Sequence, residues 1–135
     1  DYGVQSYLKV AWVTGCSLLI NLKNFLEMPY FEPDYFLYYE DVDFCDRYAE
    51  QGHLVAMTNQ IKVIHEPSSI TLKYGYLRLI HNIYSNLVIL EKRTNKLVLW
   101  RILIKMIITS FIVLPFNPKF SLSKLQGIWM YLSRK

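Results

Sequence analysis

The chain has 135 residues, of which 53% are hydrophobic, and its formal net charge is +4. This length is enough for one domain with a buried core, and the hydrophobic fraction is high for a soluble domain. Composition excludes a disulfide scaffold or a cysteine-rich zinc module, since Cys16 and Cys45 have no such spacing, and a reducing compartment is favoured. The residues after Asp1 show no signal-peptide pattern, and we expect them to continue a longer protein.

Charge is distributed unevenly along the chain. All 11 acidic residues lie at or before Glu91, whereas nine of the 15 basic residues lie from Lys92 onward, among long apolar runs. This asymmetry indicates two parts with different roles, and a basic, apolar tail favours an anionic surface as its partner. We expect no nucleic-acid partner, because the basic residues are interleaved with aliphatic runs rather than with exposed aromatic side chains.

The first part of the chain predicts short elements. Residues 6–20 read as two strand-like stretches interrupted at Thr14-Gly15, where the glycine suits a bulge or the close approach of a ligand. Residues 21–28 predict one or two helical turns that end at Pro29.

An aromatic loop over residues 30–39 then leads into a predicted helix. Carboxylates in its first turn complement the helix dipole, and Gly52 is a typical residue just after a helix end. Short strands are expected over residues 53–58 and 61–65.

Beyond Pro67 the apolar spacing becomes helical, over residues 68–96, 97–114 and 121–135. Ser121 or Ser123 would cap the last helix. That helix would carry a set of large apolar residues on one side: Leu122, Leu125, Ile128, Trp129 and Leu132. The composition changes near residues 66–70, which predicts an α/β portion over residues 1–70 and a helical tail over residues 71–135.

Three stretches follow one another in a recognisable order, namely WVTGCSLLI, YFEPDYFLYYEDVDFCDRYAEQGH and VIHEPSSIT. This order resembles the C-terminal half of the family-2 inverting glycosyltransferases, particularly their bacterial rhamnosyltransferase-like branch, over about residues 10–71. The resemblance implies the acceptor-side part of a GT-A-type fold. It also implies an enzyme that moves a sugar from a nucleotide-sugar donor to a glycan or lipid-linked acceptor, with this piece inactive alone.

The resemblance also implies roles for individual residues. Asp41 corresponds to the general base that takes the proton of the acceptor hydroxyl, and Glu40 would bind acceptor hydroxyls beside it. Trp12 and Gly15 would shape a sugar pocket. Asp43 belongs with these substrate-binding positions, although its spacing of four from an arginine favours an ion pair along the helix. Without the family pattern, a purely structural acidic turn is the favoured interpretation, because acidic helix starts are common, and Trp12 is as readily a core residue.

His65 corresponds to a family histidine that completes the coordination of a divalent cation, manganese or magnesium, on the donor diphosphate. Without that context, a histidine on an apolar strand is more often a packed core residue. The triplet Asp41-Val42-Asp43 spells D-x-D, but it opens a helix after the tryptophan–glycine stretch, so we do not interpret it as the family's metal motif. Ser85-Asn86 stands where relatives often have R-N, so no arginine–phosphate contact is expected.

Residues 97–114 are about long enough to cross a membrane, but they include Arg101 and Lys105. A helix that lies in the interface of an anionic membrane is therefore favoured over a span. Packing on the catalytic domain, or across a homodimer, remains the alternative. The expected location is cytoplasmic, peripheral to the inner face of the cell membrane. The alternative function is a non-catalytic membrane-binding or oligomerisation module.

Overall fold

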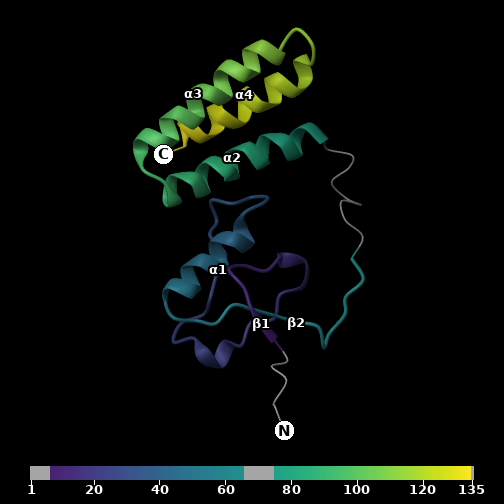
Figure 1. Ribbon diagram of the computed structural model, residues 1–135, viewed down its shortest axis with the longest axis vertical. Coiled ribbons are helices and arrows are strands. Elements are labelled where there is room, and N and C mark those ends of the chain that lie inside the picture. Colours follow the sequence, from purple (N-terminus) through teal and green to yellow (C-terminus); the bar gives the residue numbers. More distant parts are fainter. Residues whose placement is uncertain (1–6, 66–74, 135) are drawn as a thin grey trace. The chain divides into compact units, whose positions relative to one another are not determined.

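The computed structural model describes residues 7–65 and 75–134, which belong to two compact units (Figure 1). Unit 1 comprises Asp1–Pro33 and Glu40–Pro67, and unit 2 comprises Asp34–Tyr39 and Ser68–Lys135. The units are therefore not consecutive in the chain. A short aromatic segment belongs to the helical unit before the chain returns to unit 1.

Unit 1 contains short elements around one helix, and unit 2 contains three long helices. The elements of unit 1 are β1 (Tyr7–Lys9), the 3-10 turns η1 (Gly15–Ser17) and η2 (Leu22–Asn24), α1 (Glu40–Glu50) and β2 (Ala56–Thr58). Those of unit 2 are α2 (Gly75–Arg93), α3 (Lys96–Val113) and α4 (Pro118–Ser133). These elements do not by themselves assign a fold, and the GT-A-type α/β class stays a prediction.

The strands of unit 1 form one antiparallel pair in which Leu8 lies opposite Met57. Two strand predictions were wrong. The chain after Thr14 forms the 3-10 turn η1 instead, because the threonine side chain accepts a hydrogen bond from Cys16 N. Residues 61–65 form no strand, since no neighbouring strand pairs with their backbone groups within residues 7–65.

Helix α1 confirms the prediction made from its end signals. It has acidic residues in its first turn, and Gly52 follows it with a φ of 90° that suits glycine. Its buried residues are Asp43, Phe44, Cys45 and Tyr48. Phe31 stacks on Phe44 at 4.7 Å between ring centroids, and Phe25 meets the edge of Tyr48 at 5.0 Å. These contacts hold α1 against the loops of unit 1.

Helices α3 and α4 start at asparagine caps. Asn95 accepts a hydrogen bond from Val98 N at the start of α3, and Asn117 accepts one from Phe120 N at the start of α4. The cap predicted for α4 at Ser121 or Ser123 was wrong, because the Asn117-Pro118 pair starts the helix earlier. Both serines are instead buried inside the bundle.

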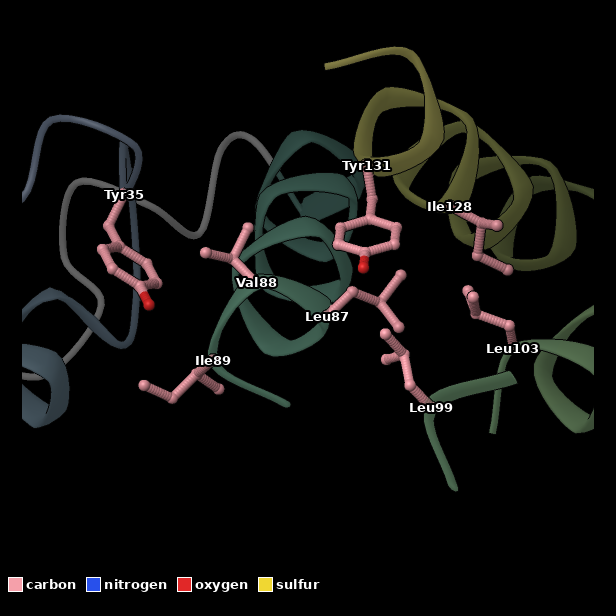
Figure 2. Packing of buried hydrophobic residues seen from close by; sticks show 8 residues of the cluster. All are labelled: Tyr35, Leu87, Val88, Ile89, Leu99, Leu103, Ile128 and Tyr131. Carbon is pink, nitrogen blue, oxygen red and sulfur yellow. The ribbon is translucent and has the colours of Figure 1, made fainter. Parts of the chain in front are cut away.

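The hydrophobic core of unit 2 lies on both sides of α2 (Figure 2). Leu87 faces Tyr131 of α4 and Leu99 of α3, whereas Val88 lies on the side of the Tyr35 ring (Figure 2). Leu87 and Val88 are 0% and 1% exposed, so α2 is the central helix of this unit.

The aromatic segment Asp34–Tyr39 is fixed to α2 by hydrogen bonds as well as by Tyr35. Ser85 Oγ donates to the Leu37 carbonyl at 2.8 Å, and Asn86 Nδ2 donates to Tyr39 Oη at 2.7 Å. Tyr38 and Tyr39 both have a φ of 68°, a left-handed conformation that costs a residue with a side chain about 1–2 kcal/mol. The contacts with α2 hold these two residues in that strained conformation just before α1 begins.

The predicted apolar side of α4 is largely exposed. Of its members Ile128 is buried, but Leu122, Trp129 and Leu132 are more than half exposed. The inward side combines small residues with Ile128 and Tyr131, and Gly127 lies where α4 approaches α2 closely. No helix within the described part of the chain is both long and apolar enough to cross a membrane.

Gly127 marks that close approach and supports a stability prediction. A Cβ at this position would lie 2.7 Å from the Ile80 carbonyl oxygen and 2.8 Å from Ile83 Cβ. We expect Gly127→Ala to lower the free energy of unfolding by about 1–3 kcal/mol, measured by urea titration, because backbone atoms of α2 must move. Gly75→Ala is the control, since no atom lies within 4 Å of its added Cβ. Equal stability of the two variants would contradict the close packing.

Candidate active site

Asp41 and Gly15 lie in contact, although they are far apart in the sequence. Asp41 Oδ2 accepts a hydrogen bond from Gly15 N at 2.9 Å, and Oδ1 accepts one from Val42 N at 2.8 Å. A Cβ on Gly15 would lie 3.6 Å from Asp41 Cβ, so these residues are at van der Waals distance. Asp41 is half-buried, and a carboxylate has about four acceptor positions, so these two hydrogen bonds leave room for a further donor.

Glu40 comes first in α1, and one of its carboxylate oxygens has an unusual environment. Glu40 Oε2 is shielded from solvent, yet it accepts no hydrogen bond from any residue that the structure describes. A shielded oxygen without a donor is costly, and such groups often have a role that involves a ligand. The arrangement is compatible with the predicted role of Glu40 in binding hydroxyl groups.

The turn η1 brings a cysteine and a histidine together next to Gly15. Cys16 Sγ lies 3.4 Å from His65 Nε2, and Thr14 Oγ1 donates to the same sulfur at 3.3 Å. His65 therefore contacts the residue that directly follows Gly15, whose backbone N–H binds Asp41. Sequence reasoning did not include Cys16 in the site, and the only available signal was its position directly after Gly15.

Trp12 lies at a hollow in unit 1. The hollow has a volume of about 420 Å³, which is within the range of small-molecule sites. Its walls are mainly apolar and include Trp12, Val13, Thr14 and Met57. The Trp12 side chain is 51% exposed, so it is not an ordinary core residue. Asp41 is not among the residues that line this hollow. The structure thus brings Gly15 to Asp41, while Trp12 lines a hollow that Asp41 does not line.

Asp43 has a structural environment. It is 1% exposed and forms the predicted pair with Arg47, whose Nε donates to Asp43 Oδ2 at 2.7 Å. Arg47 also donates to the Tyr30 carbonyl at 2.7 Å. Burial alone would lower the pKa of Arg47, but its hydrogen bond with Asp43 and the charge of that carboxylate raise the pKa overall, so the pair stays ionised. The ion pair is confirmed, and a direct contact of Asp43 with substrate stays a prediction.

Cys45, the second cysteine, is a buried residue of α1 with its thiol directed to the Val13 carbonyl. Burial raises the pKa of the Cys45 thiol, and the nearby Asp41 carboxylate adds to this effect. A thiol with a raised pKa is a poor nucleophile, so Cys45 has a packing role.

A divalent cation has no complete site in this part of the chain. No three His, Cys, Asp or Glu side chains converge within residues 7–65 and 75–134. His65 Nε2 and Cys16 Sγ form a nitrogen–sulfur pair, whereas magnesium prefers oxygen donors. The described residues therefore do not fit a manganese or magnesium site by themselves. His65 as a ligand stays a prediction that needs donors from other residues.

Comparison of the chain with protein-family models, with curated proteins and with solved structures gave no match. The functional assignment therefore depends on the residues of the acidic helix and of the tryptophan–glycine stretch. The strongest geometric link between these two stretches is the hydrogen bond from Gly15 N to Asp41.

Proposed function

We propose that this chain is the acceptor-side part of an inverting glycosyltransferase of the GT-A type, with Asp41 as its general base. The observation that carries this proposal is the hydrogen bond from Gly15 N to Asp41 Oδ2 at 2.9 Å. It joins the two stretches whose order resembles the family, and it fixes the carboxylate at the start of α1.

The proposed reaction uses Asp41 to activate the acceptor. The acceptor hydroxyl donates a hydrogen bond to a lone pair of Asp41 that no backbone donor occupies, and its oxygen attacks the anomeric carbon from the face opposite the nucleotide. The proton passes to Asp41 while the bond from the anomeric carbon to the diphosphate oxygen breaks. That oxygen keeps the bonding electron pair, and the anomeric centre is inverted.

Other residues position the acceptor in this proposal. Gly15 N fixes the rotation of the Asp41 carboxylate, and Glu40 accepts hydrogen bonds from acceptor hydroxyls through its unpartnered oxygen. Trp12 offers an exposed aromatic face to a sugar ring. The nucleotide and its cation would be held by upstream residues of a longer chain.

The configuration of the product tests this function. A longer enzyme that contains this chain with a nucleotide-binding segment is incubated with a panel of nucleotide-sugar donors and hydroxyl acceptors. We expect transfer with inversion, read from the anomeric proton coupling of the product. Transfer with retention would contradict the proposal, as would donor consumption in which only water accepts the sugar.

A non-catalytic membrane-binding or oligomerisation module is the second candidate. The observation in its favour is the large exposed apolar surface of α3 and α4. This surface is also compatible with a membrane-bound enzyme. Undiminished transfer after loss of the Asp41 carboxylate would favour the second candidate.

A further inference from the structure

Helix α4 buries several small residues and exposes several large apolar ones. The buried set is Ser121, Ser123 and Gly127 together with Ile128 and Tyr131, whereas Trp129 and Leu132 are 68% and 52% exposed. A helix in a domain surrounded by water normally turns most of its large apolar residues toward the core. Small residues at the helix contacts and large ones outside are typical of helices surrounded by lipid.

Helix α3 carries a continuous apolar stripe on its outer side. The members recur every three or four residues and are all more than half exposed: Leu97, Trp100, Ile104, Ile108 and Phe111. We call this set the α3 stripe. Leu99 and Leu103, which lie between its members in sequence, are buried on the opposite side. The stripe runs nearly the whole length of α3, roughly 27 Å at 1.5 Å per residue, and an exposed patch of this extent marks an interaction surface.

Basic side chains flank the α3 stripe. Arg101 and Lys105 each follow a stripe residue directly, so they lie along one edge of it, and both are exposed. Neither forms an ion pair with any residue in the described ranges. Acidic residues do not occur after Glu91, so this surface is positively charged. An apolar stripe with a basic edge is the pattern of a helix that lies flat in a membrane interface.

We propose that the α3 stripe, with Arg101 and Lys105, docks on an anionic lipid surface. The stripe enters the boundary between headgroups and acyl chains, and the two long basic side chains extend to lipid phosphates. A second copy of the chain fits this surface less well. It would bring two equally basic edges together, with no acidic residue from Lys92 onward to neutralise them. This inference does not depend on the proposed catalysis.

Charge removal provides the first test. The whole 135-residue chain is floated with phosphatidylcholine vesicles, with and without phosphatidylglycerol. We expect binding to the anionic vesicles alone. The double variant Arg101→Gln, Lys105→Gln should bind them roughly thirty-fold more weakly, because each basic residue near an anionic surface contributes about a factor of five. The matched control, Lys23→Gln with Lys62→Gln, removes the same charge from unit 1 and should retain binding.

Removal of apolar area provides the second test. The variant Trp100→Ser, Ile104→Ser should lose at least about ten-fold in binding while its far-ultraviolet circular dichroism stays unchanged, since both side chains are exposed. Leu26→Ser with Ile64→Ser is the control, because these exposed residues belong to unit 1. Equal flotation of the stripe variant and its control would overturn the proposal. So would a chain that never floats and forms a dimer which the stripe variant dissociates.

Discussion

Asp41→Asn in the complete enzyme should lower kcat by about 10²- to 10⁴-fold, the usual contribution of a positioned general base. The amide can still accept the hydrogen bond from Gly15 N through its oxygen, so the local fold should persist. It cannot take a proton from the acceptor hydroxyl. KM should change little, because Asp41 acts mainly while the new bond forms. Initial rates over a range of acceptor concentrations separate these two parameters.

Glu50→Gln is the matched control for this experiment. It makes the same change from carboxylate to amide at the other end of α1, where the side chain is exposed. We expect it to keep normal kcat and KM. A loss of the same size in both variants would mean that the negative charge of α1, rather than the base, is required. Full activity of Asp41→Asn would remove the base assignment.

Arg47→Met should lower the free energy of unfolding by about 3 kcal/mol, within the range for breaking a buried ion pair. Asp43 is 1% exposed, and this change takes away the guanidinium that donates to it at 2.7 Å. The methionine keeps most of the apolar contact area but provides no counter-charge. The loss lies at the lower end of the range because Arg47 is itself partly exposed. Urea unfolding followed by circular dichroism measures it.

Two variants make this prediction specific. Arg101→Met makes the same substitution at an exposed position, where we expect a change within about 0.5 kcal/mol. Adding Asp43→Asn to Arg47→Met should recover part of the stability, because a neutral side chain no longer needs the cation. If Arg47→Met and Arg101→Met lower the free energy of unfolding by the same amount, the ion pair makes no net contribution to the stability of unit 1.

Elements with strong end signals could be predicted from the sequence. Helix α1 starts at consecutive carboxylates and is followed by Gly52, and these signals act within one turn of the helix. The helical spacing of apolar residues also predicted α2, α3 and α4 correctly, because each helix forms its backbone hydrogen bonds locally. Local chemistry was therefore sufficient for element type.

Features that depend on distant residues could not be predicted. The side of α4 that packs against α2 was not predicted, because apolar spacing indicates which residues share a side and not which side faces a neighbouring helix. The strand expected over residues 61–65 needed a neighbour that the pattern cannot reveal. Tyr38 and Tyr39 keep a left-handed conformation through contacts with α2, although their residue type argues against it.

The candidate site shows the same division. The acidic helix and the tryptophan–glycine stretch were identified separately from their residues, and the structure adds the contact between Asp41 and Gly15. The pairing of Cys16 with His65 was missed, because residues 49 positions apart leave no signature in a single sequence. The ion pair of Asp43 with Arg47 was found, since a spacing of four is visible on any predicted helix.

Because Asp34–Tyr39 belongs to unit 2, the two units cannot be separated by one cut in the chain. A fusion or truncation designed with a single cut near Pro67 would separate the Tyr35 ring from Val88. The aromatic segment Asp34–Tyr39 would then lose its packing contacts with α2. The segment Asp34–Tyr39 therefore has to stay in the same chain as α2 for the complete core of unit 2 to form.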